Sequence, residues 1–234
     1  VFQGDPDTVF HDPRRFGPLQ LEHGFVFRRT NRRISASVRD FARVAWFWPN
    51  RGHWNGVRLL PRPDNTRVAA ALRRGGFRGQ ELVLRTNAPD TPWLADELRL
   101  AAELPIDAVL FTGLDSADAV AAAQRALDAA GGSHLPIMLM IESPRAVLNA
   151  AAMAEAGDRV ACLVVSNANL MVSMHLPETA DRVGLLASLS LVVLAARAGG
   201  IGCIDGAHLD VADARACEYA CRQSRDFGFD GKAV

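Results

Sequence analysis

Short, uninterrupted apolar segments alternate with longer amphipathic segments along most of this chain. The runs at 137–141 and 161–165 contain only apolar side chains, which is typical of parallel strands buried on both faces. On this pattern we expect strands at 24–28, 44–48, 81–85, 108–111, 137–141, 161–165 and 202–204. Helices are expected at 32–42, 65–74, 91–102, 116–130, 144–156, 179–198 and 211–225.

The regular alternation of strands and helices predicts an α/β fold with a parallel sheet and helical crossovers. Seven strands are visible, and an eighth would begin after Lys232. We therefore expect a TIM (β/α)8 barrel whose eighth strand lies at or beyond the end of the chain. The alternative is an open doubly wound sheet, but no glycine-rich phosphate loop follows the first expected strand, which disfavours its dinucleotide-binding form.

The pattern divides the chain into two parts. Residues 1–21 hold Asp-Pro and Gly-Pro pairs and predict an irregular N-terminal arm, and the opening Val1-Phe-Gln-Gly resembles the remnant of a cleaved tag. Residues 22–234 are expected to form a single barrel domain of the lyase type discussed below. No internal repeat or low-complexity segment interrupts it.

Composition and charge narrow the function classes. The 234 residues are 49% hydrophobic and 22% charged, which suits one large globular domain. The formal net charge is zero, so the whole molecule has no bias toward nucleic acid or anionic membranes. The longest apolar run, at 184–196, is too short to span a bilayer. We therefore expect a cytoplasmic protein with no nucleic-acid and no membrane partner, while an arginine-rich stretch at 28–85 favours anionic ligands.

The four cysteines and the lysine also limit the chemistry. Cys162 and Cys203 lie in expected strands, and Cys217 and Cys221 are four residues apart on an expected helix without further ligands at a recognisable spacing. We interpret all four as structural thiols of a reducing compartment. A Schiff-base aldolase needs a lysine in its site, and because Lys232 is the only lysine, the imine route is disfavoured.

Polar residues follow several of the expected strands directly. Glu142 comes after the run at 137–141, and Ser143-Pro144 then begin a helix, since proline is favoured at the first helical position. The carboxyl ends of parallel strands meet at one edge, where α/β enzymes collect their chemistry. We therefore expect one rim to carry Arg85, Glu142, residues 166–169 and Asp205. The alternatives are a solvated loop glutamate, an ion-paired strand-end arginine and a turn aspartate.

Five segments in this order resemble the HpcH/HpaI aldolase superfamily, and within it the citrate lyase β-subunit-like family. They are Leu82-Val-Leu-Arg85-Thr-Asn87 with Asp90-Thr-Pro-Trp93, Asp107-Ala-Val-Leu, Ile141-Glu-Ser-Pro-Arg145, Gly200-Ile-Gly-Cys-Ile-Asp205-Gly206 and Gly228-Phe-Asp-Gly-Lys232. The resemblance covers roughly residues 24–234. It implies a TIM barrel, usually trimeric or hexameric, that cleaves or forms carbon–carbon bonds in β-hydroxyacyl-CoA or small oxo-acid substrates through a metal-stabilised enolate.

The resemblance also assigns roles to individual residues. Arg85 is similar to the arginine that grips the substrate carboxylate and stabilises developing negative charge, a role that suits a permanently charged, bidentate guanidinium. Glu142 is similar to the first of two carboxylates that hold Mg²⁺. The second metal carboxylate of the family falls on Asn169, which offers a neutral oxygen instead. Glu142 and Asn169 are thus the expected metal ligands.

Three rim positions depart from the family pattern. Besides Asn169, no acid stands at 48–51, where the family has an acidic pair, and Phe111-Thr-Gly-Leu replaces a lysine at the end of a strand. A degenerate metal and acid site follows, with Mg²⁺ bound weakly or absent in the purified protein. Asp205 would support this site from behind or serve as a turn residue.

Two functions from different classes remain open. The first is an enzyme, a carbon–carbon lyase of the citrate lyase β-subunit-like kind, which acts on a small anionic oxo-acid or an acyl-CoA thioester. The second is a catalytically degenerate member that keeps the fold but not turnover and serves as a ligand-binding or scaffold subunit, for example in a hetero-oligomer with an active paralogue. In either case we expect a homo-trimer or hexamer unless such a paralogue takes part.

Overall fold

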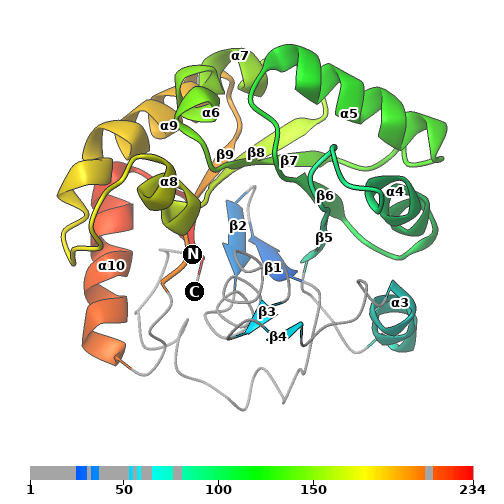
Figure 1. Ribbon diagram of the computed structural model, residues 1–234, viewed down its shortest axis with the longest axis horizontal. Helices are drawn as coiled ribbons and strands as arrows, with labels where there is room; N and C mark the ends of the chain where they lie inside the picture. The colour runs from blue at the N-terminus through cyan, green and yellow to red at the C-terminus, as the bar shows by residue number, and fades with distance from the viewer. Residues whose placement is uncertain are drawn as a thin grey trace.

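The computed structural model describes residues 25–30, 33–36, 53–54, 57–58, 65–75, 81–208 and 213–233 (Figure 1). Its strands are β1 (Phe25–Thr30), β2 (Arg33–Ala36), β3 (His53–Trp54), β4 (Val57–Arg58), β5 (Glu81–Arg85), β6 (Ala108–Phe111), β7 (Ile137–Ile141), β8 (Val160–Val165), β9 (Gly202–Asp205) and β10 (Gly231–Lys232). Its helices are α3 (Asn65–Arg74), α4 (Leu94–Glu103), α5 (Ala117–Ala129), α6 (Pro144–Leu148), α7 (Ala150–Ala154), α8 (Asn167–Ser173), the 3-10 helix η1 (Val183–Leu185), α9 (Leu186–Ala198) and α10 (Ala214–Phe227).

A curled sheet forms the centre of the fold, with the strand order β10-β9-β8-β7-β6-β5-β1-β2. The six strands β5 to β10 are parallel, whereas β1 pairs antiparallel with both β5 and β2. Helices α4, α5, α7, α9 and α10 lie along the outer side of the parallel part (Figure 1). The architecture is thus α/β, with parallel strands connected by helices from β5 onward.

The predicted (β/α)8 barrel with an eighth strand at or beyond the chain end is wrong. The last strand, β10, lies within the chain, and the first two strands form an antiparallel hairpin in place of two parallel βα units. Only residues 31–32 separate β1 from β2, and a parallel connection needs a crossover of a dozen or more residues. The curl brings β2 near β10, but no backbone ladder joins these two strands in the part of the chain that the structure describes.

Most expected elements from residue 81 onward agree with the structure, but the helix expected at 179–198 begins only at Val183 as η1 and continues from Leu186 as α9. Five strands match within one residue, and the helix expected at 65–74 is α3. The helix expected at 144–156 is divided at Asn149 into α6 and α7, and α8 was not expected. The helix expected at 32–42 is contradicted by β2, while the strand expected at 44–48 and the arm at 1–21 lie outside the described residues.

Alternate residues of the parallel strands face opposite sides of the sheet, as the strand period of two requires. One side packs against the helices, and its buried residues include Leu84, Phe111 and Leu139. The other faces the inside of the curl, and its buried residues include Val83, Leu110, Met138, Met140, Cys162, Val164 and Ile204. Burial on both faces explains the continuous apolar runs of the sequence. None of the helices in the described part is long and apolar enough to cross a membrane.

Candidate functional site at the carboxyl ends of the parallel strands

Arg85 is the last residue of β5, and its position follows from the strand period. Val83 faces the inside of the curl, so Arg85, two residues later, lies on the same side at the carboxyl end of the strand. Burial lowers the pKa of Arg85 to about 10, while the nearby Glu142 carboxylate raises it. The guanidinium therefore stays charged at neutral pH in a partly desolvated position beside a carboxylate.

Glu142 directly follows β7, and each of its two carboxylate oxygens accepts one hydrogen bond. The backbone N–H of Gly113 donates to Oε1 at 2.6 Å, and the amide Nδ2 of Asn169 donates to Oε2 at 2.6 Å. Gly113 follows β6 and has a φ of +70°. A Cβ at this position would stand 2.6 Å from the Cβ of Ala88, so both the backbone conformation and the space favour glycine.

Asn169 lies in the first turn of α8, which begins directly after β8. The structure therefore brings together Arg85, Glu142 and Asn169, the three site residues that the sequence predicts, at the ends of three different strands. Gly113 is the participant that the sequence analysis missed. The sequence analysis considered Phe111-Thr-Gly-Leu only because this segment lacks the lysine of the family. A glycine directly after an expected strand was the signal that could have identified Gly113.

The fit of a divalent cation depends on the oxygen atoms at this rim. Among the described residues, no group of three or more His, Cys, Asp or Glu side chains could hold a metal ion. Glu142 supplies one anionic oxygen pair, and rotating the Asn169 amide by 180° would present Oδ1 in place of Nδ2. Mg²⁺ commonly takes one or two carboxylates and keeps several waters. The two residues thus fit Mg²⁺ as a site with a single negative charge.

The loop that follows Arg85 is held by a buried carboxylate on α4. Glu97 accepts a hydrogen bond from the backbone N–H of Asn87 at 2.7 Å, and the Asn87 side-chain amide donates to its other oxygen. Burial raises the pKa of Glu97, although these hydrogen bonds oppose the shift. Since Asn87 is two residues from Arg85, this contact helps to fix the end of β5.

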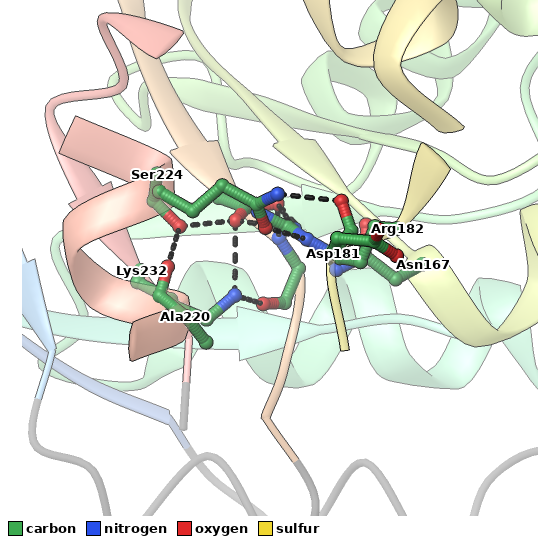
Figure 2. Close-up of polar contacts among 9 residues, drawn as sticks. Asn167, Asp181, Arg182, Ala220, Ser224 and Lys232 are labelled. Atoms are coloured by element: carbon green, nitrogen blue, oxygen red, sulfur yellow. Dashed lines mark hydrogen bonds and ion pairs between the residues drawn. The ribbon is translucent and has the colours of Figure 1, made fainter. Parts of the chain in front are cut away.

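Asp205 ends β9 but faces α10 rather than the inside of the curl, because its neighbour Ile204 faces inward. Its carboxylate is fully buried and accepts hydrogen bonds from Arg182 at 2.8 and 2.6 Å and from Lys232 Nζ at 2.9 Å. The Ser224 hydroxyl, the Gly206 N–H and the Asn167 amide also donate to this carboxylate. Figure 2 shows Arg182, Ser224 and Lys232 in one cluster of polar contacts.

Charge pairing decides the protonation of this cluster. Burial alone would raise the pKa of Asp205, but Lys232 and Arg182 outweigh it, so the pKa lies below its usual range. Burial lowers the pKa of Lys232, and Asp205 opposes that shift. Lys232 also donates to the Gly206 carbonyl at 2.7 Å. The only lysine of the chain therefore serves an ion pair, and nothing in the sequence pattern pointed to Arg182 or Ser224.

Taken together, these features define an α/β protein with an arginine, a carboxylate and an amide at the carboxyl ends of parallel strands, where such folds place their reactive groups. The profile of the HpcH/HpaI aldolase/citrate lyase family matches residues 64–234, and the chain belongs to this family. The predicted family membership is thereby confirmed.

Individual relatives are similar over part of their length. A (3S)-malyl-CoA thioesterase of Cereibacter sphaeroides is 34% identical over 153 residues, which are 65% of this chain and 51% of that protein. The citrate lyase subunit beta of Leuconostoc mesenteroides subsp. cremoris is 26% identical over 185 residues, which are 75% of this chain and 61% of that protein. The chain thus spans about half the length of the first of these relatives.

Solved structures agree at the level of the fold. The protein CitE of Mycobacterium tuberculosis, in complex with magnesium, acetoacetate and coenzyme A, has a TM-score of 0.60 with this chain at 23% identity. The match covers 74% of this chain and 63% of that one. At this identity the likeness establishes the fold and not the ligands.

Proposed function

We propose that the chain is the catalytic part of a carbon–carbon lyase that acts on an acyl-CoA thioester or a small oxo-acid. The observation that carries this proposal is the placement of the partly desolvated Arg85 guanidinium beside the Glu142–Asn169 pair. Family membership supports an acyl-CoA or oxo-acid ligand, since the matched relatives are named for malyl-CoA and citrate.

Arg85 anchors the anionic group of the ligand. A guanidinium binds a carboxylate through two parallel hydrogen bonds, and partial burial strengthens each of them because less water competes. The same charge stabilises negative charge that develops on a neighbouring carbonyl oxygen during bond cleavage, provided that the oxygen lies within hydrogen-bond distance. Glu97 and Asn87 keep the end of β5 in place for this purpose.

Glu142 and Asn169 would hold Mg²⁺, and a bound Mg²⁺ supplies polarisation of a substrate carbonyl. Gly113 keeps one Glu142 oxygen in a fixed direction through its N–H group. With a single negative charge, the site binds the cation weakly and relies on the anionic substrate for further oxygen ligands. This proposal retains the sequence-based expectation of a weak metal site.

A second candidate function is a ligand-binding subunit without turnover. The hydrogen bond from Asn169 to Glu142 favours it, because the amide N–H occupies a carboxylate oxygen that a cation would otherwise bind. The cytoplasmic location, the homo-trimer or hexamer and the pairing with an active paralogue remain predictions. Light scattering at micromolar concentration tests the assembly, and a clean monomer would contradict it.

Ligand binding and product formation distinguish the two candidates. Thermal shifts are measured with oxaloacetate, pyruvate and acetyl-CoA, with and without Mg²⁺, for the wild type and for Arg85→Ala. We expect truncation to cost about 1.5–3 kcal/mol of carboxylate binding, the range for hydrogen bonds to charged groups. Arg99→Ala is the matched control, because Arg99 is exposed on α4 and forms its ion pair with Asp96 of the same helix.

The outcomes separate clearly. A shift that persists unchanged in Arg85→Ala removes Arg85 from the site. Binding that depends on Arg85, together with cleavage of an acyl-CoA substrate into two products by chromatography, supports the lyase. Release of free CoA with an intact acid points to thioester hydrolysis instead, and binding without any product supports the ligand-binding subunit.

A further inference from the structure

We propose that Asp205 is a positioning residue that holds both ends of segment 167–182 and thereby sets Asn169 against Glu142. We call this double attachment of segment 167–182 to Asp205 the clamp. Its effect on Mg²⁺ binding rests on the proposed function, whereas the clamp itself is argued from the contacts of Asp205 alone. It assigns to the buried ion pairs a role in the arrangement of the rim.

The first end of the segment is held by a close backbone approach. Gly206 lies against Asn167, the first residue of α8, so closely that a Cβ on Gly206 would stand 2.6 Å from Asn167 Cγ and 2.8 Å from its backbone nitrogen. The Asn167 amide also donates to Asp205 Oδ1 at 3.5 Å. Asn169 follows two residues later in the same turn, so its position depends on this contact.

The second end is held by Arg182, the residue before η1. Its guanidinium reaches both Asp205 oxygens, and its Nε donates to Gln223 Oε1 at 2.7 Å. Gln223 in turn donates to the Asp181 carbonyl. Arg182 has a φ of +52°, a conformation that a non-glycine residue keeps only when its surroundings hold it there. Asn167 and Arg182 thus contact the same Asp205 carboxylate, and Figure 2 draws both in this cluster of polar contacts.

The carboxylate can hold both ends because it is buried, ionised and rigidly supported. Lys232 and Ser224 bind it from β10 and α10, so it cannot rotate away from the segment. Between the two ends, Leu170 is fully buried, while Asn169 reaches Glu142 at 2.6 Å. Loosening either end would therefore lengthen or misalign the bond between Asn169 and Glu142.

Methionine methyl groups report on the segment directly. Of the five methionines, Met171 and Met174 lie in the segment, whereas Met138, Met140 and Met153 lie in β7 and α7. In ¹³C-methyl spectra of the full chain, Arg182→Gln should move or sharpen the signals of Met171 and Met174 and leave the other three in place. Unchanged signals at both positions would overturn the clamp.

A matched control separates this effect from the general loss of an ion pair. Arg197 binds Asp230 through two nitrogens, at 2.8 and 3.0 Å, and lies outside the segment. Arg197→Gln should therefore leave Met171 and Met174 unchanged. Arg182→Lys keeps the charge and should restore part of the wild-type spectrum, and it also replaces Arg182→Gln if that variant does not fold.

Mg²⁺ titration of the same proteins tests the positioning role. Arg182→Gln should weaken Mg²⁺ binding about tenfold, a factor equivalent to ~1.4 kcal/mol, and Arg182→Lys should recover part of it, while binding of oxaloacetate without Mg²⁺ stays at the wild-type level. Altered methyl signals with unchanged Mg²⁺ affinity would overturn the positioning role. If the wild type binds no Mg²⁺, the metal part of the proposed function fails, and the methyl spectra still decide the clamp.

Discussion

Replacing Asn169 by aspartate tests the metal site most directly. In the wild type the Asn169 amide donates to Glu142 at 2.6 Å. Asn169→Asp replaces this donor with a second carboxylate at hydrogen-bond distance from the first. We expect the variant to be less stable without a cation and to bind Mg²⁺ more tightly than the wild type, because the same two charges that repel each other attract a cation placed between them.

The magnitudes follow from the geometry. Two unit charges about 4 Å apart near a protein surface repel by about 4 kcal/mol, and partial exposure of Glu142 reduces this to roughly 2 kcal/mol through solvent and salt. For a chain of this size, a loss of 1 kcal/mol lowers the Tm by about 2–4 °C, so we expect a decrease of about 4–8 °C. Mg²⁺ affinity should rise at least about tenfold, or ~1.4 kcal/mol.

The pH dependence has a definite sign. A pair of adjacent carboxylates has one strongly raised pKa in the folded state. A raised folded pKa means that stability is lost as the pH rises through it, so the deficit of Asn169→Asp should be present at pH 7 and should disappear as the pH falls toward about 4. Added Mg²⁺ at pH 7 should remove the deficit in the same way.

Calorimetric titration with Mg²⁺ and thermal unfolding at several pH values measure these effects. Asn149→Asp is the control, because the Asn149 amide donates to the Asp115 carbonyl at 2.7 Å and not to Glu142. It adds the same charge at the junction of α6 and α7. Wild-type Mg²⁺ binding at low micromolar affinity, or no gain in Asn169→Asp over Asn149→Asp, would refute the assignment of Asn169 to the metal site.

Two further variants test the supports of the rim. Asp205→Asn leaves Arg182 and Lys232 without their carboxylate, so we expect a loss of about 3–5 kcal/mol at pH 7 by chemical denaturation. Because the pKa of Asp205 is lowered in the folded state, its contribution is present above the unfolded pKa of about 3.9 and is lost as the pH falls through the folded value, so the variant should show a flatter acid limb. Gly113→Ala places a Cβ 2.6 Å from Ala88 at a φ of +70° and should cost about 1–3 kcal/mol. A Gly113→Ala protein with wild-type stability and Mg²⁺ affinity would show that the loop accommodates the methyl group.

Local patterns predicted the parallel part of the fold well. Continuous apolar runs such as Ile137–Ile141 mark strands that are buried on both faces, and a serine before Pro144 marks a helix start that the structure confirms, since Ser143 accepts from the Ala146 N–H at 3.0 Å. The antiparallel hairpin of β1 and β2 was not predicted. A helix was expected at 32–42 instead, because a segment as short as Arg33-Ile-Ser-Ala36 does not distinguish a strand from a helix by its period. The pairing with β1 identifies it as a strand, and the short connection at 31–32 makes that pairing antiparallel.

The sequence by itself determined which residue types stand at the strand ends, and hence that Arg85, Glu142 and Asn169 would meet, because the carboxyl ends of parallel strands lie at one edge. Only the tertiary structure decided what each of them binds. The donation from Gly113 to Glu142 depends on a loop conformation, and the pairing of Arg182, Ser224 and Lys232 with Asp205 joins residues 19 to 27 positions away. Such partners are chosen by the packing of β9, β10 and α10 in space, which no local pattern of the chain records.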